Sequence, residues 1–457
     1  MKPSEKLSLI LGQKLGESRI IDDPDILDQY SKDKSHCLPS MPDLGIRVKT
    51  EDEIKTVINE AVKLDVPIVA RGAGTGKSGG AIPVSGGIII DTSTMTDILK
   101  IDRDNLIAVV EPGIITGEFQ KAVEAEGLFY PPDPNSLETC TIGGNLAHNA
   151  GGPRAFKYGV TTNYVLGTRT VLPNGEVIKT GKITVKGVTG YDITSLLVGS
   201  EGTLGIFSAA TLRLIRKPIE ISTLLILMPD EQSAGIAISK IVAAGLVPRV
   251  LEFMDSSVTK VLASKGINGI KSNTGSIILA EVDGTDEDFV EQDVLRLGEI
   301  CDNAGAIDIL MARHGSEREK LWAARRLMSD AMAETAKFKI SEDIVVPRSE
   351  ISKLLKGLKD LSKQYGVNVA SYGHAGDGNF HVNVLWNEED FKPEKIIGDI
   401  FNLTLQLGGT ITGEHGVGIS KQAYITREQS PALIAIQKEL KKTFDPKNLM
   451  NPGKIFP

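Results

Sequence analysis

The chain has 457 residues, of which 41% are hydrophobic and 24% charged, the balance of an ordinary globular protein. This length exceeds what one hydrophobic core usually fills, so we expect two or three domains. The formal net charge of −8 argues against general affinity for nucleic acid or for an anionic membrane surface. No apolar run approaches the ~20 residues of a membrane-spanning helix, and residues 1–17 lack a signal-peptide pattern, so we expect a cytoplasmic protein.

The first half of the chain predicts short strands mixed with helices. Residues 51–64 have apolar side chains spaced along one face of a helix. Short strands are expected after it at 66–70, 88–91 and 108–111. A hairpin is expected over 165–179, with Pro173-Asn174-Gly175 at its turn.

From Pro218 onward, longer apolar strands alternate with amphipathic helices. The sequence predicts strands at 223–228 and 276–282 and helices at 231–244, 286–304 and 317–336. No internal repeat is apparent. We therefore expect a first domain over 1–217, a second over 218–419 and a C-terminal segment, 420–457, that returns to the first domain.

The loop Arg71-Gly-Ala-Gly-Thr-Gly-Lys-Ser78 nearly spells a nucleotide-binding P-loop. A P-loop has glycine five residues before the Gly of its Gly-Lys-Ser/Thr, and that position here is Arg71. No helix-forming run follows Ser78 either. Successive small residues still expose backbone N–H groups that bind phosphate oxygens. The loop alone is compatible with a cofactor phosphate site, a nucleotidase or a simple glycine-rich turn.

Further motifs follow in an order that resembles the vanillyl-alcohol-oxidase-type flavoproteins. They are Arg-Gly-x-Gly-Thr at 71–75, Pro131-Pro-Asp-Pro-Asn-Ser136, the glycine groups at 141–145 and 149–152, the long signature 191–205, and Asn451-Pro-Gly-Lys454. The resemblance covers nearly the whole chain. It implies an α+β fold with a two-lobed FAD-binding domain and an α+β, ferredoxin-like substrate or cap domain.

The same resemblance implies that residues 71–76, 132–149 and 201–206 line FAD. In members with covalent flavin a histidine commonly sits in the first loop, and residues 71–83 contain none, so we expect non-covalent FAD. The residues expected to bind FAD are Arg71, Gly72, Gly74, Thr75, Gly76, Pro132, Asp133, Ser136, Thr141, Gly144, Asn145, Ala147, Asn149, Glu201, Gly205 and Ile206.

Three of the six histidines fall in two C-terminal motifs, residues 371–383 and 408–416. His374, His381 and Glu414 offer two imidazoles and one carboxylate, a competent ligand set for a divalent metal with open positions. The alternative is a polar pocket lining without metal. The surrounding glycines predict that His374 lies in a tight loop before a strand that carries His381.

These motifs resemble those of FAD-linked 2-hydroxy-acid dehydrogenases, including D-lactate and D-2-hydroxyglutarate dehydrogenases and the flavin subunit of glycolate oxidase. The resemblance implies that His374, His381 and Glu414 hold the metal (zinc, manganese or iron) and that His415 is the base. Oxidation of a D-2-hydroxy acid to the 2-oxo acid removes the hydroxyl proton and transfers the α-hydrogen to flavin N5 as hydride.

A cation is expected to hold the substrate carboxylate. Arg325 and Ser329 share one face of the predicted helix. Leu-Trp-x-x-Arg resembles the carboxylate-binding arginine of the family, so Arg325, Ser329 and Asn383 are expected at the substrate; the alternative for Arg325 is a surface salt bridge. No second-carboxylate lysine can be placed in 337–344, which favours D-lactate or glycolate over D-2-hydroxyglutarate.

Three rival interpretations remain: a non-redox alkylglycerone-phosphate-synthase-like flavoenzyme, a P-loop nucleotidase, and a non-catalytic subunit of a larger oxidase. The last would be expected to lack the histidine motifs. No cysteine pattern for an iron–sulfur cluster occurs, so any such cluster must lie on a partner, and the electron acceptor stays open. The candidates are a quinone, a cytochrome, a flavoprotein carrier, oxygen or an iron–sulfur subunit, and a membrane-bound acceptor would make the protein peripheral to the membrane. A homodimer is the candidate assembly.

Overall fold

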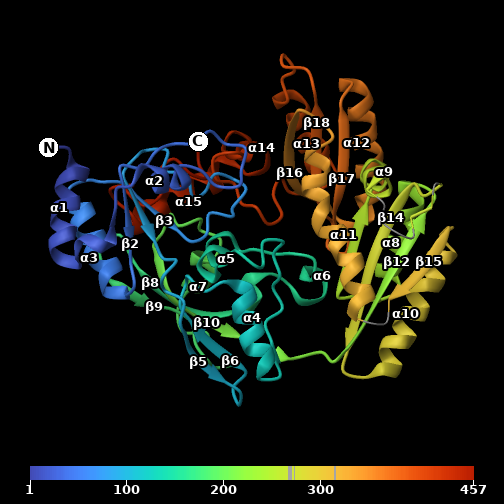
Figure 1. The fold of residues 1–457 in the computed structure, drawn as a ribbon, viewed down its shortest axis with the longest axis horizontal. Coiled ribbons are helices and arrows are strands. Elements are labelled where there is room, and N and C mark those ends of the chain that lie inside the picture. The colour runs from blue at the N-terminus through green and yellow to red at the C-terminus, as the bar shows by residue number, and fades with distance from the viewer. Residues whose placement is uncertain (266–269, 272, 313–314) are drawn as a thin grey trace. The chain divides into compact units, whose positions relative to one another are not determined.

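The computed structural model describes residues 1–265, 270–271, 273–312 and 315–457. They form two compact units (Figure 1). Unit 1 comprises residues 1–151, 160–217 and 414–457, and unit 2 comprises residues 152–159 and 218–413. Unit 2 thus ends at Gly413 instead of the predicted 419, and it includes a short segment that the sequence does not assign to it. The strands and helices predicted by range are all present, with ends shifted by three residues or fewer.

Unit 1 contains two larger sheets and a two-stranded one, in which β7 (Leu128–Phe129) pairs with β11 (Ile215–Arg216). The first has the order β1-β2-β4-β3, with β2, β4 and β3 parallel. The second is antiparallel, has the order β5-β6-β10-β8-β9, and contains the predicted hairpin as β8 and β9. The strands of these sheets are β1 (Ile20–Ile21), β2 (Leu44–Arg47), β3 (Ile68–Arg71), β4 (Ile88–Asp91), β5 (Ile98–Asp102), β6 (Ile107–Val110), β8 (Val165–Val171), β9 (Val177–Lys179) and β10 (Ile206–Arg213).

Helix α3 (Glu51–Lys63) packs on the first sheet through its apolar face. Thr50 caps the helix, because its Oγ1 accepts a hydrogen bond from Glu53 N at 3.2 Å. Ile54 and the other apolar residues of this face are fully buried against β2, β3 and β4. Strand β3 ends at Arg71, so the glycine loop leaves from the carboxyl edge of the parallel strands, where open α/β sheets bind ligands.

Unit 2 contains one seven-stranded antiparallel sheet of order β15-β12-β14-β13-β17-β18-β16. Its first four strands and their helices have the connectivity of a ferredoxin-like βαββαβ unit. The strands and helices of the second half follow one another in the same order. An isolated antiparallel β-bridge between Val345 and Thr410 takes the place of its fourth strand. The strands are β12 (Glu220–Met228), β13 (Val250–Met254), β14 (Ser276–Gly284), β15 (Asp308–Ala312), β16 (Phe338–Val345), β17 (Asn368–His374) and β18 (Asn379–Trp386).

The two ferredoxin-like halves join where β13 pairs with β17, and this repeat is not visible in the sequence. One face of the sheet is covered by α8 (Glu231–Ala243), α10 (Glu287–Asp302), α12 (Ile351–Tyr365) and α13 (Glu394–Gln406). The other face packs against α9 (Ser256–Ser264) and α11 (Gly315–Ala333). Among the helices that the structure describes, none is both long enough and apolar enough to cross a membrane.

The final segment, residues 414–457, belongs to unit 1 and closes its first sheet. Asn451 N donates to Ile68 O at 2.7 Å, and Asn451 adopts φ 45°. Its side-chain Nδ2 donates to the carbonyls of Gly80 and Glu201 at 2.8 and 2.7 Å. One buried amide therefore ties the C-terminal segment to the glycine loop and to the loop before β10.

Replacing Asn451 by alanine should lower the free energy of unfolding of unit 1 by about 2–4 kcal/mol. The carbonyls of Gly80 and Glu201 would lose their hydrogen-bond donor, and alanine tolerates the left-handed backbone conformation at this position less well than asparagine does. Urea denaturation followed by circular dichroism measures this loss. Asn448→Ala is the matched control, since Asn448 also has a positive φ, 51°, but is exposed. Equal losses in the two variants would contradict the role given to the amide hydrogen bonds.

Candidate functional site

The glycine loop after β3 has the features of an anion-binding turn. Within the described part of the chain, no residue accepts a hydrogen bond from the N–H groups of residues 72–77. Gly74 has φ 66°, which glycine adopts without steric cost. No helix follows Ser78, unlike in a P-loop. A row of amides without protein acceptors fits the oxygens of a cofactor diphosphate.

The guanidinium of Arg71 is engaged within the protein. Its Nη1 and Nη2 donate to the carbonyls of Lys32 and Gln29 at 3.0 and 3.1 Å, and it lies 5.4 Å from the centroid of the Tyr30 ring. Burial lowers the pKa of this group. The side chain therefore anchors residues 29–32 beneath the loop, a structural role that the sequence does not indicate.

The three segments predicted to line FAD are linked to one another in unit 1. A Cβ on Gly72 would collide with Thr141, the capping residue of α5 (Ile142–His148). Main-chain bonds then join α5 to the loop before β10, with Glu201 N donating to Ala147 O at 2.8 Å. The other predicted FAD residues lie in four places along the chain. Thr75 and Gly76 are in the glycine loop, and Pro132, Asp133 and Ser136 precede α5. Gly144 and Asn145 are in α5, Asn149 is its C-terminal cap, and Gly205 and Ile206 are at the start of β10.

Two predicted FAD side chains also stabilise this framework. Asn145 is buried and donates through Nδ2 to Thr116 Oγ1 at 2.7 Å. Asn149 ends α5 with φ 50°, and its Oδ1 accepts a hydrogen bond from Thr162 N at 2.9 Å. These contacts fix the glycine-rich segment around α5.

A carboxylate and an imidazole fix the main chain next to His415. The oxygens Oε1 and Oε2 of Glu201 accept hydrogen bonds from Val417 N and Gly418 N, each at 2.8 Å. His148 Nδ1 lies 3.1 Å from the carbonyl oxygen of His415. Glu201 thus orients the segment that carries the predicted base. His148, between the two glycine groups, also contacts this segment, a contact that the sequence analysis did not predict.

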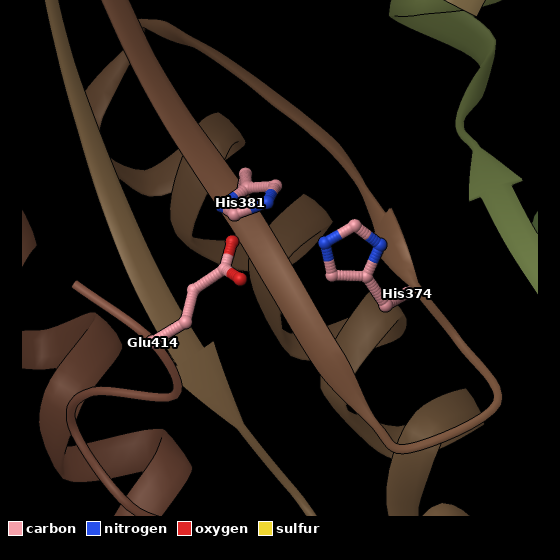
Figure 2. A group of neighbouring side chains, drawn as sticks. All are labelled: His374, His381 and Glu414. Atoms are coloured by element: carbon pink, nitrogen blue, oxygen red, sulfur yellow. The ribbon is translucent and has the colours of Figure 1, made fainter. Parts of the chain in front are cut away.

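The structure brings His374 and His381 of unit 2 together with Glu414, the residue after Gly413, as the sequence predicts (Figure 2). One potential ligand atom from each residue lies within 4.8 Å of the others. The two imidazole rings have centroids 5.4 Å apart and planes at 87°. Both histidines are buried, and Glu414 directly follows Gly413, the last residue of unit 2. Two imidazoles and one carboxylate fit zinc, manganese or iron.

A hairpin places the two histidines side by side. His374 is the last residue of β17, not part of a loop as the glycines predict, and the turn occupies residues 375–378. The pairing of Tyr372 with His381 puts both histidines on the sheet face that packs against α11. Gly378 has φ 82°, and a Cβ there would collide with Val346 O, so this turn requires glycine.

Asp343, on the neighbouring strand β16, holds the chain that leads to Glu414. It is fully buried and lies opposite His381 in the sheet. Its Oδ2 accepts hydrogen bonds from Gly413 N at 2.8 Å and from Thr412 Oγ1 at 3.1 Å, and its Oδ1 accepts one from Asn379 Nδ2 at 2.6 Å. The carboxylate of Asp343 thus fixes the position of Thr412 and Gly413, the two residues before Glu414.

Arg325 lies on α11 and is only 3% exposed, so the surface salt bridge considered for it is wrong. Its Nε donates to Glu252 Oε2, and the other oxygen of Glu252 contacts His374 Nδ1. The guanidinium carbon lies 5.2 Å from the centroid of the Tyr372 ring. Burial favours the neutral form of Glu252, but the charge of Arg325 and the hydrogen bonds to Arg325 and His374 outweigh it and lower its pKa to about 2.

The other predicted substrate residues lie on the same side of unit 2. Asn383 is fully buried; its Nδ2 donates to His381 O at 3.2 Å, and its Oδ1 is buried without a hydrogen-bond partner among the described residues. Ser329 accepts hydrogen bonds from Lys339 Nζ through its carbonyl at 2.7 Å and its Oγ at 3.1 Å. Lys339 on β16 thus contacts Ser329, which lies one helical turn from Arg325 on α11; Lys339 falls within 337–344, where the sequence analysis could not place a second-carboxylate lysine.

Two family models match most of the chain. Residues 42–181 match the family model described as FAD binding domain, and residues 217–455 match that described as FAD linked oxidases, C-terminal domain. The chain is 42% identical to glycolate oxidase subunit GlcD of Bacillus subtilis, covering 93% of this chain and 92% of that protein. It is 32% identical to a D-lactate dehydrogenase of Anaerostipes hadrus, covering 97% and 96%.

Solved structures show the fold. A substrate-bound p-cresol methylhydroxylase superposes with a TM-score of 0.81 at 17% identity, covering 99% of this chain and 96% of that one. An alkyldihydroxyacetonephosphate synthase superposes with a TM-score of 0.77 at 20% identity, covering 98% and 84%. These likenesses support the α+β fold of vanillyl-alcohol-oxidase type that the motifs predict. The chain thus belongs to the FAD-linked oxidases and is an FAD-dependent oxidoreductase.

Proposed function

We propose that this protein oxidises a small D-2-hydroxy acid, such as D-lactate or glycolate, to the 2-oxo acid. The observation that carries the proposal is the convergence of His374, His381 and Glu414 beside the buried cation Arg325. A 2-hydroxy acid presents a hydroxyl and a carboxylate on adjacent carbons. The cluster offers ligands for a metal that the hydroxyl would approach, and Arg325 offers N–H donors for the carboxylate.

Each residue has a separate task in this proposal. His374, His381 and Glu414 would hold a divalent metal, which supplies a Lewis acid that favours ionisation of the substrate hydroxyl. His415, the residue after Glu414, takes the hydroxyl proton, a task that suits an imidazole near neutral pH. When bound, FAD supplies the hydride acceptor at N5, for which the loop over residues 71–76 is the proposed diphosphate contact.

The carboxylate is assigned to Arg325 because one edge of its guanidinium remains available. Nε is bonded to Glu252, whereas Nη2 is buried without a hydrogen-bond partner among the described residues. A buried donor without an acceptor costs about 1–3 kcal/mol, which a substrate carboxylate would recover. Asn383 Oδ1 is a second buried polar atom without a protein partner and could accept a substrate hydrogen bond.

A second substrate, D-2-hydroxyglutarate, is favoured by one observation. Lys339 lies beside Ser329, one helical turn from Arg325, so this part of unit 2 carries a second cation. A dicarboxylate needs such a cation for its distal group, whereas D-lactate and glycolate do not.

A non-redox alkylglycerone-phosphate-synthase-like reaction would leave the flavin without net reduction. Bleaching of the flavin by the substrate under anaerobic conditions would therefore exclude that reaction. The electron acceptor is proposed to be a separate protein or quinone.

Replacing His415 by asparagine should leave FAD bound but slow its reduction by the hydroxy acid by ~10²-fold or more, because the proton acceptor is lost. Anaerobic stopped-flow absorbance measures the rate, and the visible spectrum reports bound FAD. His36→Asn, which removes an exposed histidine, is the control and should react like the wild type. Wild-type reduction rates in His415→Asn would remove His415 from the mechanism.

Treatment with a chelator should abolish flavin reduction by the hydroxy acid while the protein keeps its yellow FAD. Adding back zinc, manganese or iron separately should restore the reaction with the metal that the site uses, because the three ligands then recover the Lewis acid. Metal analysis before and after treatment verifies removal. Full activity in metal-free protein would contradict the metal role.

A further inference from the structure

One buried carboxylate contacts two of the proposed site residues at once. Glu252 lies in β13, has no exposed surface, and bonds to Arg325 Nε through one oxygen and to His374 Nδ1 through the other. We infer that Glu252 is a positioning residue that sets the metal-binding imidazole and the substrate-binding guanidinium in one fixed arrangement. The inference rests on the proposed function for the roles of Arg325 and His374.

The contact with His374 determines which ring nitrogen is available to a metal. An ionised carboxylate only accepts hydrogen bonds, so the proton of His374 lies on Nδ1. This tautomer leaves the lone pair on Nε2, the arrangement in which a second carboxylate orients a metal-binding histidine and raises its basicity. Removing Glu252 would therefore take away the acceptor that sets this tautomer and contributes to the orientation of the ring.

The contact with Arg325 determines which edge of the guanidinium faces the substrate. Glu252 occupies Nε, and the Tyr372 ring lies 5.2 Å from the guanidinium carbon. These two neighbours leave Nη2 as the donor for an incoming carboxylate. The negative charge of Glu252 also offsets the cost of burying the cation before substrate arrives.

Strand register explains why this residue can serve both partners. Glu252 lies directly opposite His374 where β13 pairs with β17, and α11 packs on the same sheet face. Other buried carboxylates of unit 2 have other partners. Asp343 holds Gly413, and Glu231 bonds to Lys359 of α12 and to Ser256 at the start of α9. Glu231 therefore offers a matched control, a buried and cation-paired glutamate whose hydrogen bonds go to neither Arg325 nor His374.

The test compares Glu252→Gln with Glu231→Gln in the full-length FAD-bound protein. Glutamine has one acceptor oxygen and presents an amide donor in place of the second oxygen, so at position 252 one of the two partners would face a donor instead of an acceptor. We expect metal-depleted Glu252→Gln to bind Zn²⁺ about 10- to 100-fold more weakly than wild type in calorimetric titration. The KM for the hydroxy acid should also rise, whereas Glu231→Gln should keep the wild-type Zn²⁺ affinity and KM.

Wild-type Zn²⁺ affinity in a folded Glu252→Gln protein would overturn the inference and leave the proposed function standing. Equal losses in the two variants would also overturn it, because they would report general destabilisation. Failure of the wild type to bind Zn²⁺, Mn²⁺ or Fe²⁺ would instead refute the proposed metal site. If Glu252→Gln does not fold, Glu252→Asp is the second variant, because it keeps the buried charge but is one methylene shorter. The same loss of Zn²⁺ affinity is expected for it, and an unchanged Zn²⁺ affinity would overturn the inference.

Discussion

The pairing of β13 with β17 is the constraint on which the site of unit 2 depends. This single strand pair joins the two ferredoxin-like halves into one sheet and places Glu252 opposite His374. The hairpin of β17 and β18 then sets His381 next to His374, and Asp343 on β16 fixes the chain before Glu414. A regular antiparallel sheet thus positions ligands that come from distant parts of the sequence.

Charge balance explains why such a polar cluster can be buried. Arg325 is nearly inaccessible to water, and an unpaired buried guanidinium would be strongly destabilising. Glu252 neutralises it and at the same time accepts from His374, so one carboxylate satisfies two groups. Arg325 Nη2 and Asn383 Oδ1, two buried polar atoms without a hydrogen-bond partner in the described part of the chain, are the atoms assigned to substrate.

Much of the fold and the cluster could be predicted from the sequence because local patterns specify them. The amphipathic helix at 51–64 and the glycine loop follow from spacing and residue type, and the ordered motifs predict a flavoprotein. His374, His381 and Glu414 were found because few histidines occur and three of them fall in glycine-rich motifs.

The features that the sequence does not reveal depend on which residues and strands, far apart in the chain, lie next to one another in the fold. Glu252 stands alone in the apolar strand Val-Leu-Glu-Phe-Met, a signal that indicates a buried charge but not its partners. Arg71 looks like a phosphate ligand beside its glycines, yet its guanidinium bonds to carbonyls 39 and 42 residues earlier in the chain. The ferredoxin-like repeat is likewise a matter of strand order, which no internal sequence similarity discloses.

The most direct test of the account is an anaerobic titration of the FAD-bound protein with glycolate, D-lactate, L-lactate and D-2-hydroxyglutarate, followed by the visible flavin absorbance. The account predicts that at least one of the achiral or D acids bleaches the flavin in a single turnover and that L-lactate does so more slowly. The acid that reacts fastest distinguishes the monocarboxylate from the dicarboxylate assignment. An unchanged flavin spectrum with every acid, in protein that retains FAD and metal, would contradict the account.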